Sequence, residues 1–326
     1  MLPQFNEMWR RRKPNLMPLS QHLPENDSRS PWVFLRLLRV THWIKNVFVF
    51  LPLPFALATG AELDPLSFLF GLSGFCLLNS SVYILNDVKD RHRDAEHPSK
   101  RYRPVASGEV SLSMANKLSF ILGILGMLLL GFGAYYGGCN YLDFRETILS
   151  LPGIGLTYFI ANVIYTVWVR SVVWLDVIFL GLFFLLRLIL GCSLSGVYPS
   201  AMLLMTGFSL ALMMAIGKRY SELSSGLGSV FRNSLGTYST GTLAFAFRGS
   251  ALISLLGYGW YCWSSPLMDS SGWWWSICPV AIGLMKYHQE VIRAGGQIEP
   301  VELVLGSYWP ILVLGLWVVS LMTSMN

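Results

Sequence analysis

Nine apolar segments, each close to the length that crosses a bilayer, constrain the fold of this chain most. They lie at residues 46–61, 66–86, 114–136, 148–168, 172–196, 200–217, 249–265, 272–286 and 306–324. A helix needs about 20 apolar residues to span the hydrocarbon core, where its backbone polar groups must be satisfied internally. Only 13% of the residues are charged, against about a quarter in a soluble domain. The sequence therefore predicts an all-α polytopic membrane protein, a bundle of about nine transmembrane helices in one domain over residues 32–326.

Residues 1–31 differ from the apolar segments in composition. They are polar, contain prolines and carry the basic run Arg10-Arg11-Arg12-Lys13. No apolar stretch follows this run within the region, so we do not expect a cleaved signal peptide. We expect a disordered cytoplasmic tail with some affinity for anionic lipid headgroups. The next stretch, Trp32 to Lys45, is amphipathic, and we expect it to begin the first transmembrane helix in the membrane interface.

The distribution of positive charge predicts the orientation of the bundle. All 24 Lys and Arg residues except Arg145 and Arg187 precede the first segment or lie in, or at the edge of, the loops after even-numbered segments. Because cytoplasmic loops collect Lys and Arg, the N-terminus and these loops should be cytoplasmic. The net charge of +6 follows from this rule and requires no nucleic-acid partner. We expect anionic membrane lipids and phosphorylated substrates as partners, and an active-site cavity at the cytoplasmic side.

An acidic cluster directly follows the second apolar segment. Asp87, Asp90 and Asp94 stand at spacings of three and four residues, and Asn86 precedes them. On a helix the three aspartates fall on one face, where their charges repel unless a cation lies between them. Hard oxygen ligands of this kind suit Mg²⁺, which often shares its site with substrate phosphates. The cluster predicts a catalytic Mg²⁺ site with Asn86 as a ligand or orienting group. A solvated charged loop between two membrane helices is the alternative.

Further polar and basic residues at the same membrane face could bind phosphate oxygens. Lys45 and Asn46 lie at the first segment, Lys100, Arg101 and Arg103 follow the acidic cluster, and Lys218, Arg219, Tyr220 and Glu222 follow the sixth segment. For Lys45, a juxtamembrane lysine that snorkels to lipid headgroups is an equal alternative. Asp176 and Arg187 lie eleven residues apart, close to three helical turns, so both should point the same way into the bundle. A structural interhelical pair is the alternative to a role in binding.

The motif Asn-Asp-x-x-Asp-x-x-x-Asp at residues 86–94 resembles the UbiA superfamily of intramembrane prenyltransferases. In that superfamily the aspartates hold Mg²⁺ on a diphosphate, and most members carry a second aspartate-rich motif after the sixth span. This chain has Gly-Lys-Arg-Tyr-Ser-Glu-Leu at residues 217–223 instead. In this respect the chain resembles one branch of the superfamily, the decaprenyl-phosphate phosphoribosyltransferases. Further similar stretches are residues 42–46, 97–104, 299–303 and 165–187, which begins with Tyr165. Members of the branch usually have an Asp shortly after the last of these stretches, where this chain has Gly306-Ser307.

This resemblance implies the reaction and the partners. The donor would be 5-phosphoribosyl 1-diphosphate and the acceptor a polyprenyl phosphate, at a bacterial inner membrane, for cell-envelope glycan synthesis. Mg²⁺ on the aspartates would neutralise the departing pyrophosphate, while the candidate cations and Tyr165 would bind the substrates. Two alternatives stay open. One is a UbiA-type prenyltransferase that joins a prenyl diphosphate to an aromatic acceptor, and the other is a transporter or lipid-binding membrane protein without chemistry. A homo-oligomer is compatible with the sequence.

Overall fold

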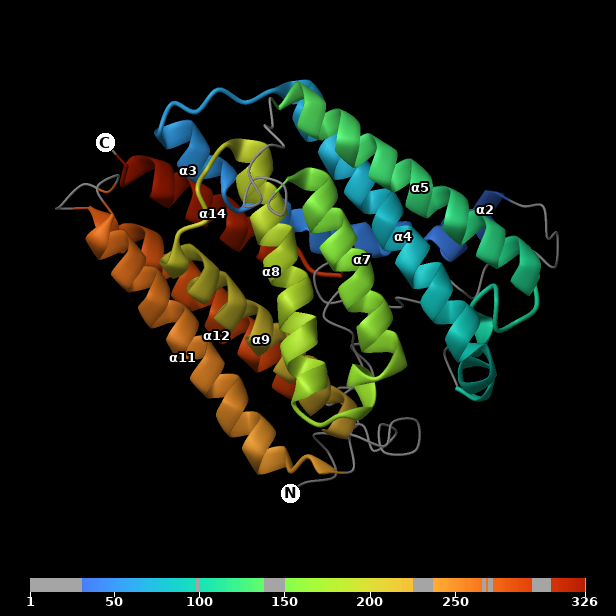
Figure 1. Ribbon diagram of the computed structural model, residues 1–326. Coiled ribbons are helices and arrows are strands. Elements are labelled where there is room, and N and C mark those ends of the chain that lie inside the picture. The colour runs from blue at the N-terminus through green and yellow to red at the C-terminus, as the bar shows by residue number, and fades with distance from the viewer. Residues whose placement is uncertain are drawn as a thin grey trace, which may run out of the picture.

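The structure of the chain is a computed structural model. It describes residues 31–97, 100–137, 150–224, 237–265, 268, 272–294 and 306–325. The predicted tail lies outside the described residues except for Pro31, and so do Arg145 and residues 299–303. Within the described ranges the regular structure is helical, with one isolated antiparallel bridge between Met268 and Met325. The helices pack side by side as a bundle (Figure 1), which agrees with the predicted fold class.

The predicted apolar segments all overlap helices of the described chain. In chain order the helices are α2 (Pro31–Leu38), η2 (Val40–Phe50), α3 (Leu53–Ala58), α4 (Pro65–Glu96), η3 (Lys100–Tyr102), α5 (Leu112–Tyr136), α7 (Leu151–Val167), η4 (Val169–Ser171), α8 (Leu175–Ser195), α9 (Ala201–Ser224), α11 (Thr240–Ser264), η6 (Trp273–Ser276), α12 (Ile277–Ala294) and α14 (Trp309–Thr323). Within the described ranges, six segments are long and apolar enough to cross a membrane: Val40–Ala58, α4, α5, α8, α9 and α11. Helices α7 and α14 are apolar but shorter. A count of nine transmembrane helices therefore stays a prediction.

The first predicted span is not one continuous helix. Helix α2 ends at Leu38, Arg39 adopts a left-handed conformation with φ of 51°, and a 3₁₀ helix of 11 residues follows. Pro52 then opens the short helix α3. Long 3₁₀ stretches are uncommon, and this one packs closely against α8, where a Cβ on Gly191 would clash with the backbone of Val49. The expectation of a single helix that starts in the interface is therefore wrong.

Helix α4 continues well past its predicted span and carries the acidic cluster. Asp64 caps its N-terminus by accepting a hydrogen bond from the Ser67 backbone N–H at 2.6 Å, and Pro65 suits the first turn. No Gly or Pro interrupts the sequence from residue 86 to His97, so the helix runs on to Glu96. His97, which precedes a proline in the sequence, is extended, as expected for that position. The alternative of a solvated loop at residues 87–94 is therefore wrong.

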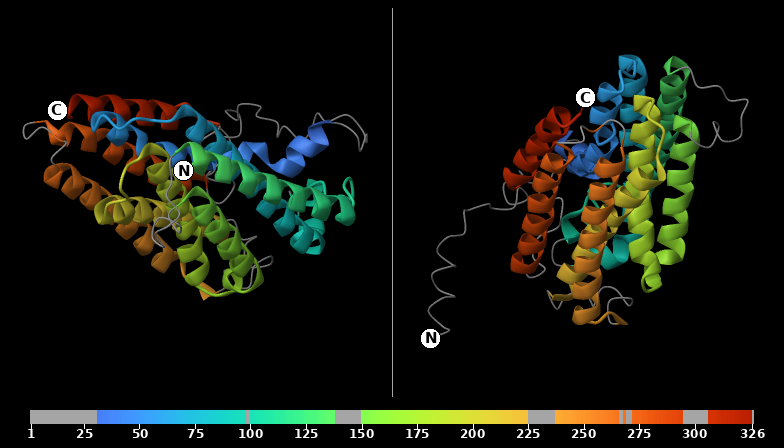
Figure 2. Two further views of the ribbon diagram at one scale, coloured as in Figure 1. Left: turned by 45° about the horizontal axis from the view of Figure 1, so that its top comes forward. Right: turned by 90° about the vertical axis from the view of Figure 1, so that its left-hand side faces the viewer.

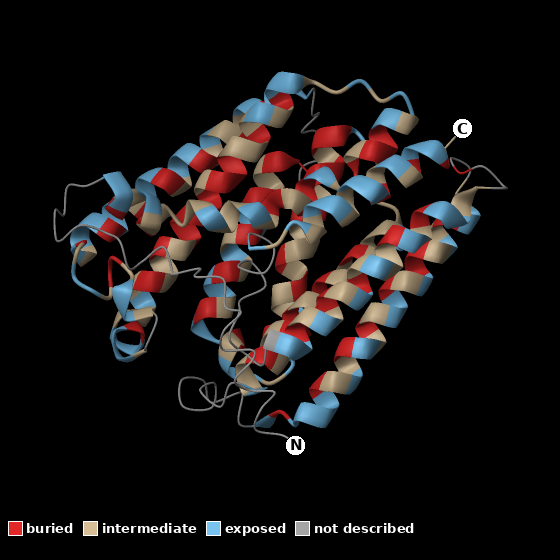
Figure 3. Cartoon of the chain, turned by 180° about the vertical axis from the view of Figure 1, so that it is seen from behind, coloured by how far each residue is buried: buried red, intermediate tan, exposed pale blue. Residues whose placement is uncertain are grey.

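Helix packing leaves an apolar outer surface. Helix α4 lies along α5, and α9 lies between α8 and α11 (Figure 2). At the contact between α4 and α5, a Cβ on Gly74 would lie 2.7 Å from the carbonyl oxygen of Gly126, so small residues let the two backbones touch. The outward faces carry large exposed apolar side chains such as Phe120, Phe245 and Ile311, and Figure 3 shows these exposed faces around the bundle. Such a surface suits lipid contact.

Candidate active site

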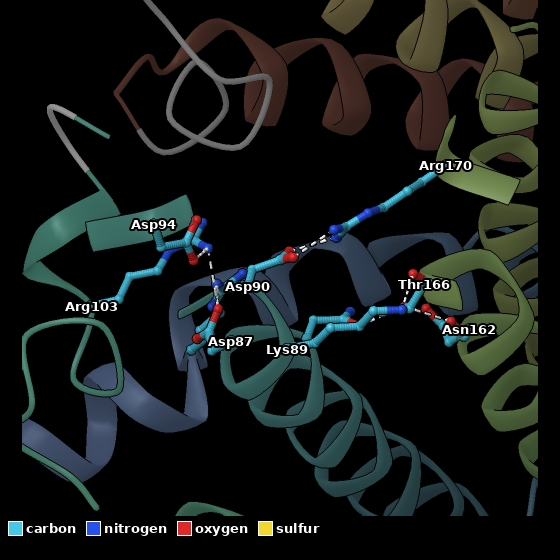
Figure 4. A network of polar contacts seen from close by, with 10 residues as sticks. Asp87, Lys89, Asp90, Asp94, Arg103, Asn162, Thr166 and Arg170 are labelled. Atoms are coloured by element: carbon cyan, nitrogen blue, oxygen red, sulfur yellow. Dashed lines mark hydrogen bonds and ion pairs between the residues drawn. The ribbon is translucent and has the colours of Figure 1, made fainter. Parts of the chain in front are cut away.

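Asp87 and Asp94 lie on one face of α4 and share one guanidinium group. Arg103 Nη1 lies 3.2 Å from Asp87 Oδ1 and 2.6 Å from Asp94 Oδ2 (Figure 4). Asp87 also accepts a hydrogen bond from Arg39. The two carboxylate side chains are only 3% and 5% exposed. A single positive nitrogen thus sits between two buried carboxylates that stand seven residues apart, as the helical spacing predicts.

Asp90 points in a different direction. Its two carboxylate oxygens accept hydrogen bonds from Arg170 Nη1 and Nη2, each at 2.6 Å. This bidentate pair is the strongest geometry available to an Arg and a carboxylate. The hydrogen bond to Asp90 raises the pKa of Arg170, so the pair stays ionised. The expectation of one common face thus holds for Asp87 and Asp94, whereas Asp90 turns toward the connection between α7 and α8 (Figure 4).

The fit of the aspartates to Mg²⁺ follows from these contacts. In the described ranges, no three His, Cys, Asp or Glu side chains are grouped closely enough to hold a metal ion. Mg²⁺ is, however, usually bound by one or two carboxylates together with water and substrate phosphates. Asp87 and Asp94 already bracket one positive atom. Their oxygens therefore fit the role of the protein carboxylates in such a site. Asp90 lies one turn of α4 from each of them.

Cations from the segment that follows α4 and from helix α9 act on one another beside this cluster. Burial, and then the positive charges of Arg103 and Lys218, lower the pKa of Lys100. Burial and the charge of Lys100 likewise lower the pKa of His97. Charges act on one another this way only over short distances. Lys100 and Arg103, which follow α4, therefore lie close enough to Lys218 of α9 for their charges to act on one another. Several cations in one region favour a ligand with several negative charges.

Arg219 and Glu222 belong to a buried network at the end of α9. Arg219 Nε lies 2.7 Å from Asp176 Oδ2, and its Nη1 lies 2.5 Å from Glu222 Oε2. Tyr238 donates to Asp176 Oδ1 at 2.7 Å, and burial together with that carboxylate raises the pKa of Tyr238. Asp176 is 0% and Arg219 1% exposed. Asp176 thus forms an interhelical pair, as the structural alternative predicted, but its partner is Arg219 of α9 and its side chain does not meet Arg187.

Arg187 and Asn46 are also buried. Arg187 donates to Asn46 Oδ1 at 3.0 Å, Asn79 Oδ1 at 2.9 Å, the hydroxyl of Tyr158 at 3.2 Å and the carbonyl of Phe183 at 2.7 Å. These acceptors come from η2, α4, α7 and α8. The guanidinium therefore ties four elements together through neutral groups. Its contacts hold η2 in the bundle, and η2 in turn carries the residues next to Asn46 toward the site.

The remaining predicted residues lie at different depths. Lys45 and Arg39 both approach the ring of Tyr83, at 5.8 Å and 5.4 Å from its centroid, so Lys45 lies near the partner of Asp87. Arg101 donates to the hydroxyl of its exposed neighbour Tyr102 at 2.6 Å, away from the cation cluster.

Three further predicted residues lie between helices. Tyr165 stacks on Phe179 with ring centroids 6.5 Å apart. Tyr220 packs against the apolar core between α8, α9, α11 and α12. Asn86 accepts a hydrogen bond from Thr166 Oγ1 at 2.6 Å and so faces α7. Among the predicted site residues of the described chain, direct contacts join Asp87 and Asp94 to Arg103, and the charges of Lys100 and Lys218 act on one another nearby.

Arg39 and Arg170 are residues of the candidate site that sequence reasoning missed. Each pairs directly with an aspartate of the cluster. Their positions beside membrane segments look like ordinary positive-inside charges, so the only available signal was their location at the same membrane face.

One cavity lies away from this cluster. It has a volume of about 280 Å³ and is lined mainly by apolar residues of α8, α9, α11, α12 and α14, among them Leu188, Met214, Tyr258, Leu284 and Trp317. None of the predicted site residues lines it. An active-site cavity at the cytoplasmic side therefore stays a prediction.

Comparison with known proteins identifies the family of the chain. The decaprenyl-phosphate phosphoribosyltransferase of Mycolicibacterium smegmatis is 28% identical over 286 residues, which cover 83% of this chain and 85% of the relative. The enzyme of the same name from Mycobacterium tuberculosis is 29% identical over 265 residues, 79% of this chain and 82% of the relative. A solved UbiA homolog from Archaeoglobus fulgidus bound to GPP and Mg²⁺ has the same fold, with a TM-score of 0.66 over 90% of this chain and 99% of the homolog at 16% identity. The sequence model of the UbiA prenyltransferase family matches residues 46–300, and the chain therefore belongs to that family.

Proposed function

We propose that this protein transfers 5-phosphoribose from 5-phosphoribosyl 1-diphosphate to a polyprenyl phosphate at the cytoplasmic face of a bacterial inner membrane. The observation that carries the proposal is the contact of Arg103 with two buried aspartates, in a region where the charges of Lys100 and Lys218 also act on one another. A site for a prenyl diphosphate needs to hold one diphosphate. The phosphoribosyl donor carries a 5-phosphate in addition, and a lipid phosphate must approach as well. The cation cluster suits this larger negative charge.

The names of the relatives support the same reaction. Two relatives that match most of this chain are called decaprenyl-phosphate phosphoribosyltransferases, and a structural neighbour binds GPP and Mg²⁺. In this chain the last turns of α9 supply Lys218 and Arg219 with a single carboxylate, Glu222. A helix end of that composition suits direct contact with phosphate oxygens better than it suits a second metal site.

The residues divide the chemistry between them. Asp87 and Asp94, with Asp90 beside them, would hold Mg²⁺, which neutralises charge on the departing pyrophosphate when it is bound. Lys100 and Lys218 would bind phosphate oxygens of the donor. The bond from ribose C1 to the pyrophosphate oxygen breaks with its electron pair on pyrophosphate, and an oxygen of the acceptor phosphate forms the new bond to C1. Because the acceptor is already an anion, no strong general base is needed, and positioning with electrostatic stabilisation suffices.

Arg219 fits a positioning role better than direct contact. Its guanidinium is buried and engaged by Asp176 and Glu222, so it fixes the last turns of α9. Lys218 is the adjacent residue, and its charge acts on Lys100. We therefore assign phosphate contact to Lys218 and the placement of Lys218 to Arg219.

The experiment that tests the proposal is a transfer assay on the purified protein. The protein is incubated with Mg²⁺, labelled 5-phosphoribosyl 1-diphosphate and a polyprenyl phosphate, and the organic phase is analysed for labelled lipid. A parallel reaction contains a prenyl diphosphate and 4-hydroxybenzoate. We expect labelled lipid in the first reaction alone. Product in the second reaction and none in the first would instead establish the orthodox prenyl transfer, and product in neither would contradict both enzymatic functions.

A further inference from the structure

Three basic side chains at the start of the first membrane segment meet the ring of Tyr83 in α4. Arg39 Cζ lies 5.4 Å and Lys45 Nζ lies 5.8 Å from the centroid of that ring. The imidazole of His42 meets it in a T-shaped arrangement, with ring centroids 5.5 Å apart. A cation within about 6 Å of an aromatic centroid is attracted by the ring quadrupole. We call Arg39, His42 and Lys45 the basic row.

The 3₁₀ geometry of η2 explains why the basic row shares one ring. Its members stand three residues apart, and a 3₁₀ helix has three residues per turn, so side chains at this spacing lie above one another. The backbone N–H of His42 donates to the carbonyl oxygen of Arg39 at 2.8 Å, so Arg39 belongs to the first 3₁₀ turn. In an α-helix, Arg39 and Lys45 would point about 120° apart. The uncommon 3₁₀ stretch therefore aligns the basic row on Tyr83.

The ring of Tyr83 lies beside the acidic cluster. Tyr83 precedes Asp87 by four residues on α4, and residues four apart share one face of a helix. Arg39 contacts both side chains, because its guanidinium also pairs with Asp87. Within the described part of the chain the Tyr83 hydroxyl makes no hydrogen bond, so the ring makes these contacts. Two positive charges at one ring repel each other, and a phosphate beside them relieves that repulsion.

We propose that Tyr83 is a positioning residue whose ring holds Arg39 and Lys45 in place to bind a substrate phosphate beside Asp87. The inference rests on the proposed function, because the ligand is a phosphate of a substrate. The acceptor lipid phosphate and the pyrophosphate part of the donor both offer this chemistry. A lysine that snorkels to lipid headgroups extends away from the bundle. Lys45 is instead half-buried and lies over a ring of α4.

The test measures ligand binding without turnover. Purified protein in a neutral detergent, at constant Mg²⁺, is titrated separately with pyrophosphate and with polyprenyl phosphate, and the rise in the thermal unfolding midpoint is followed to saturation. Tyr83→Leu removes the ring, so the half-saturating concentration of at least one ligand should increase by about two- to thirtyfold. Tyr83→Phe keeps the ring and should titrate like the wild type. The matched control is Tyr135→Leu on exposed α5, which should also titrate like the wild type.

The two ligands separate this inference from the proposed function. The ligand whose affinity falls in Tyr83→Leu identifies the phosphate that the basic row binds. Unchanged affinity for both ligands would overturn the proposal, and an equal loss in Tyr83→Phe would overturn the assignment to the ring. A wild-type protein that binds pyrophosphate but not polyprenyl phosphate would contradict the proposed transfer reaction, while pyrophosphate would still decide the role of Tyr83.

A second series keeps the test decisive if Tyr83→Leu folds poorly. Phenylalanines with increasing ring fluorination, introduced in place of Tyr83, keep the shape of the side chain but weaken the attraction of the ring for cations. We expect the affinity for the ligand to fall stepwise along this series, an effect that a purely structural role of the side chain would not produce. A flat series would overturn the proposal.

Discussion

The buried pair of Asp176 and Arg219 gives the sharpest quantitative prediction. Removing one partner of a buried ion pair typically costs about 3–5 kcal/mol, because a charge is left uncompensated in an apolar environment. Asp176→Leu leaves Arg219 with Glu222, which is 30% exposed, so part of the compensation remains. Tyr238 also loses its acceptor. We therefore expect a loss near the lower end of the range, about 3 kcal/mol in the free energy of unfolding. Arg219→Met removes the paired cation from buried Asp176, which keeps the neutral donor Tyr238, and should cost at least as much.

The double variant Asp176→Leu/Arg219→Met separates pairing from packing. Replacing a whole buried pair by apolar residues of similar volume is often neutral or stabilising, since both desolvation costs disappear. The double variant should therefore recover at least about 2 kcal/mol relative to the sum of the single losses, a coupling within the range for residues in contact. The assay is equilibrium unfolding of the purified protein in detergent micelles titrated with SDS. A loss below about 1 kcal/mol for Asp176→Leu, or strictly additive losses, would refute the reasoning.

The same double variant tests the role of Arg219 in the proposed reaction. If Arg219 only positions the end of α9, restored stability should be accompanied by a donor KM within about threefold of wild type. Direct phosphate contact would instead raise the donor KM by about tenfold or more despite restored stability. The comparison therefore distinguishes the two assignments with one protein.

Three further predictions concern the site and the tail. Asp87→Ala should retain less than a tenth of the transfer rate, a barrier increase of more than about 1.4 kcal/mol, and should lose the Mg²⁺-dependent rise in melting temperature; a retained Mg²⁺ response would rule out Asp87 as a ligand. Lys218→Ala should raise the donor KM by about ten- to a hundredfold with little change in the acceptor KM, and less so with a 5-dephosphorylated donor, in a two-substrate titration; a change confined to the acceptor KM would assign Lys218 to the lipid phosphate. Deletion of residues 1–30 should leave kcat in lipid nearly unchanged, and a truncated protein that inserts normally but loses most activity would show that the tail belongs to the site.

Much of the fold could be predicted from the sequence because membrane helices are recognisable by their length and hydropathy. The common face of Asp87 and Asp94 also followed from helical spacing alone. The partners of these residues could not be predicted, since they come from distant parts of the chain. Arg170 lies 80 residues from Asp90, and Asn46 lies 141 residues from Arg187. No local pattern encodes such contacts.

The break at Arg39 had no sequence signal of its own either. Arg is an ordinary helix former, and a left-handed residue is usually Gly or Asn. The conformation at Arg39 is imposed by tertiary packing, in which η2 lies against α8 and the guanidinium reaches Asp87. The contact of Arg39 with Asp87 and the irregular backbone are thus two aspects of the same arrangement.

The close contact between Gly74 and Gly126 means that a substitution there would tilt the whole of α4. Thirteen residues, about 20 Å of uninterrupted helix, separate Gly74 from Asp87. Any side chain at that contact would push α4 away from α5, and a rigid rod would carry the tilt to the carboxylates at its far end. Substitutions deep in the membrane, which touch neither substrate nor cation, should therefore alter the spacing of Asp87 and Arg103. The mutational sensitivity of the candidate site should therefore extend about 20 Å along α4 from its carboxylates.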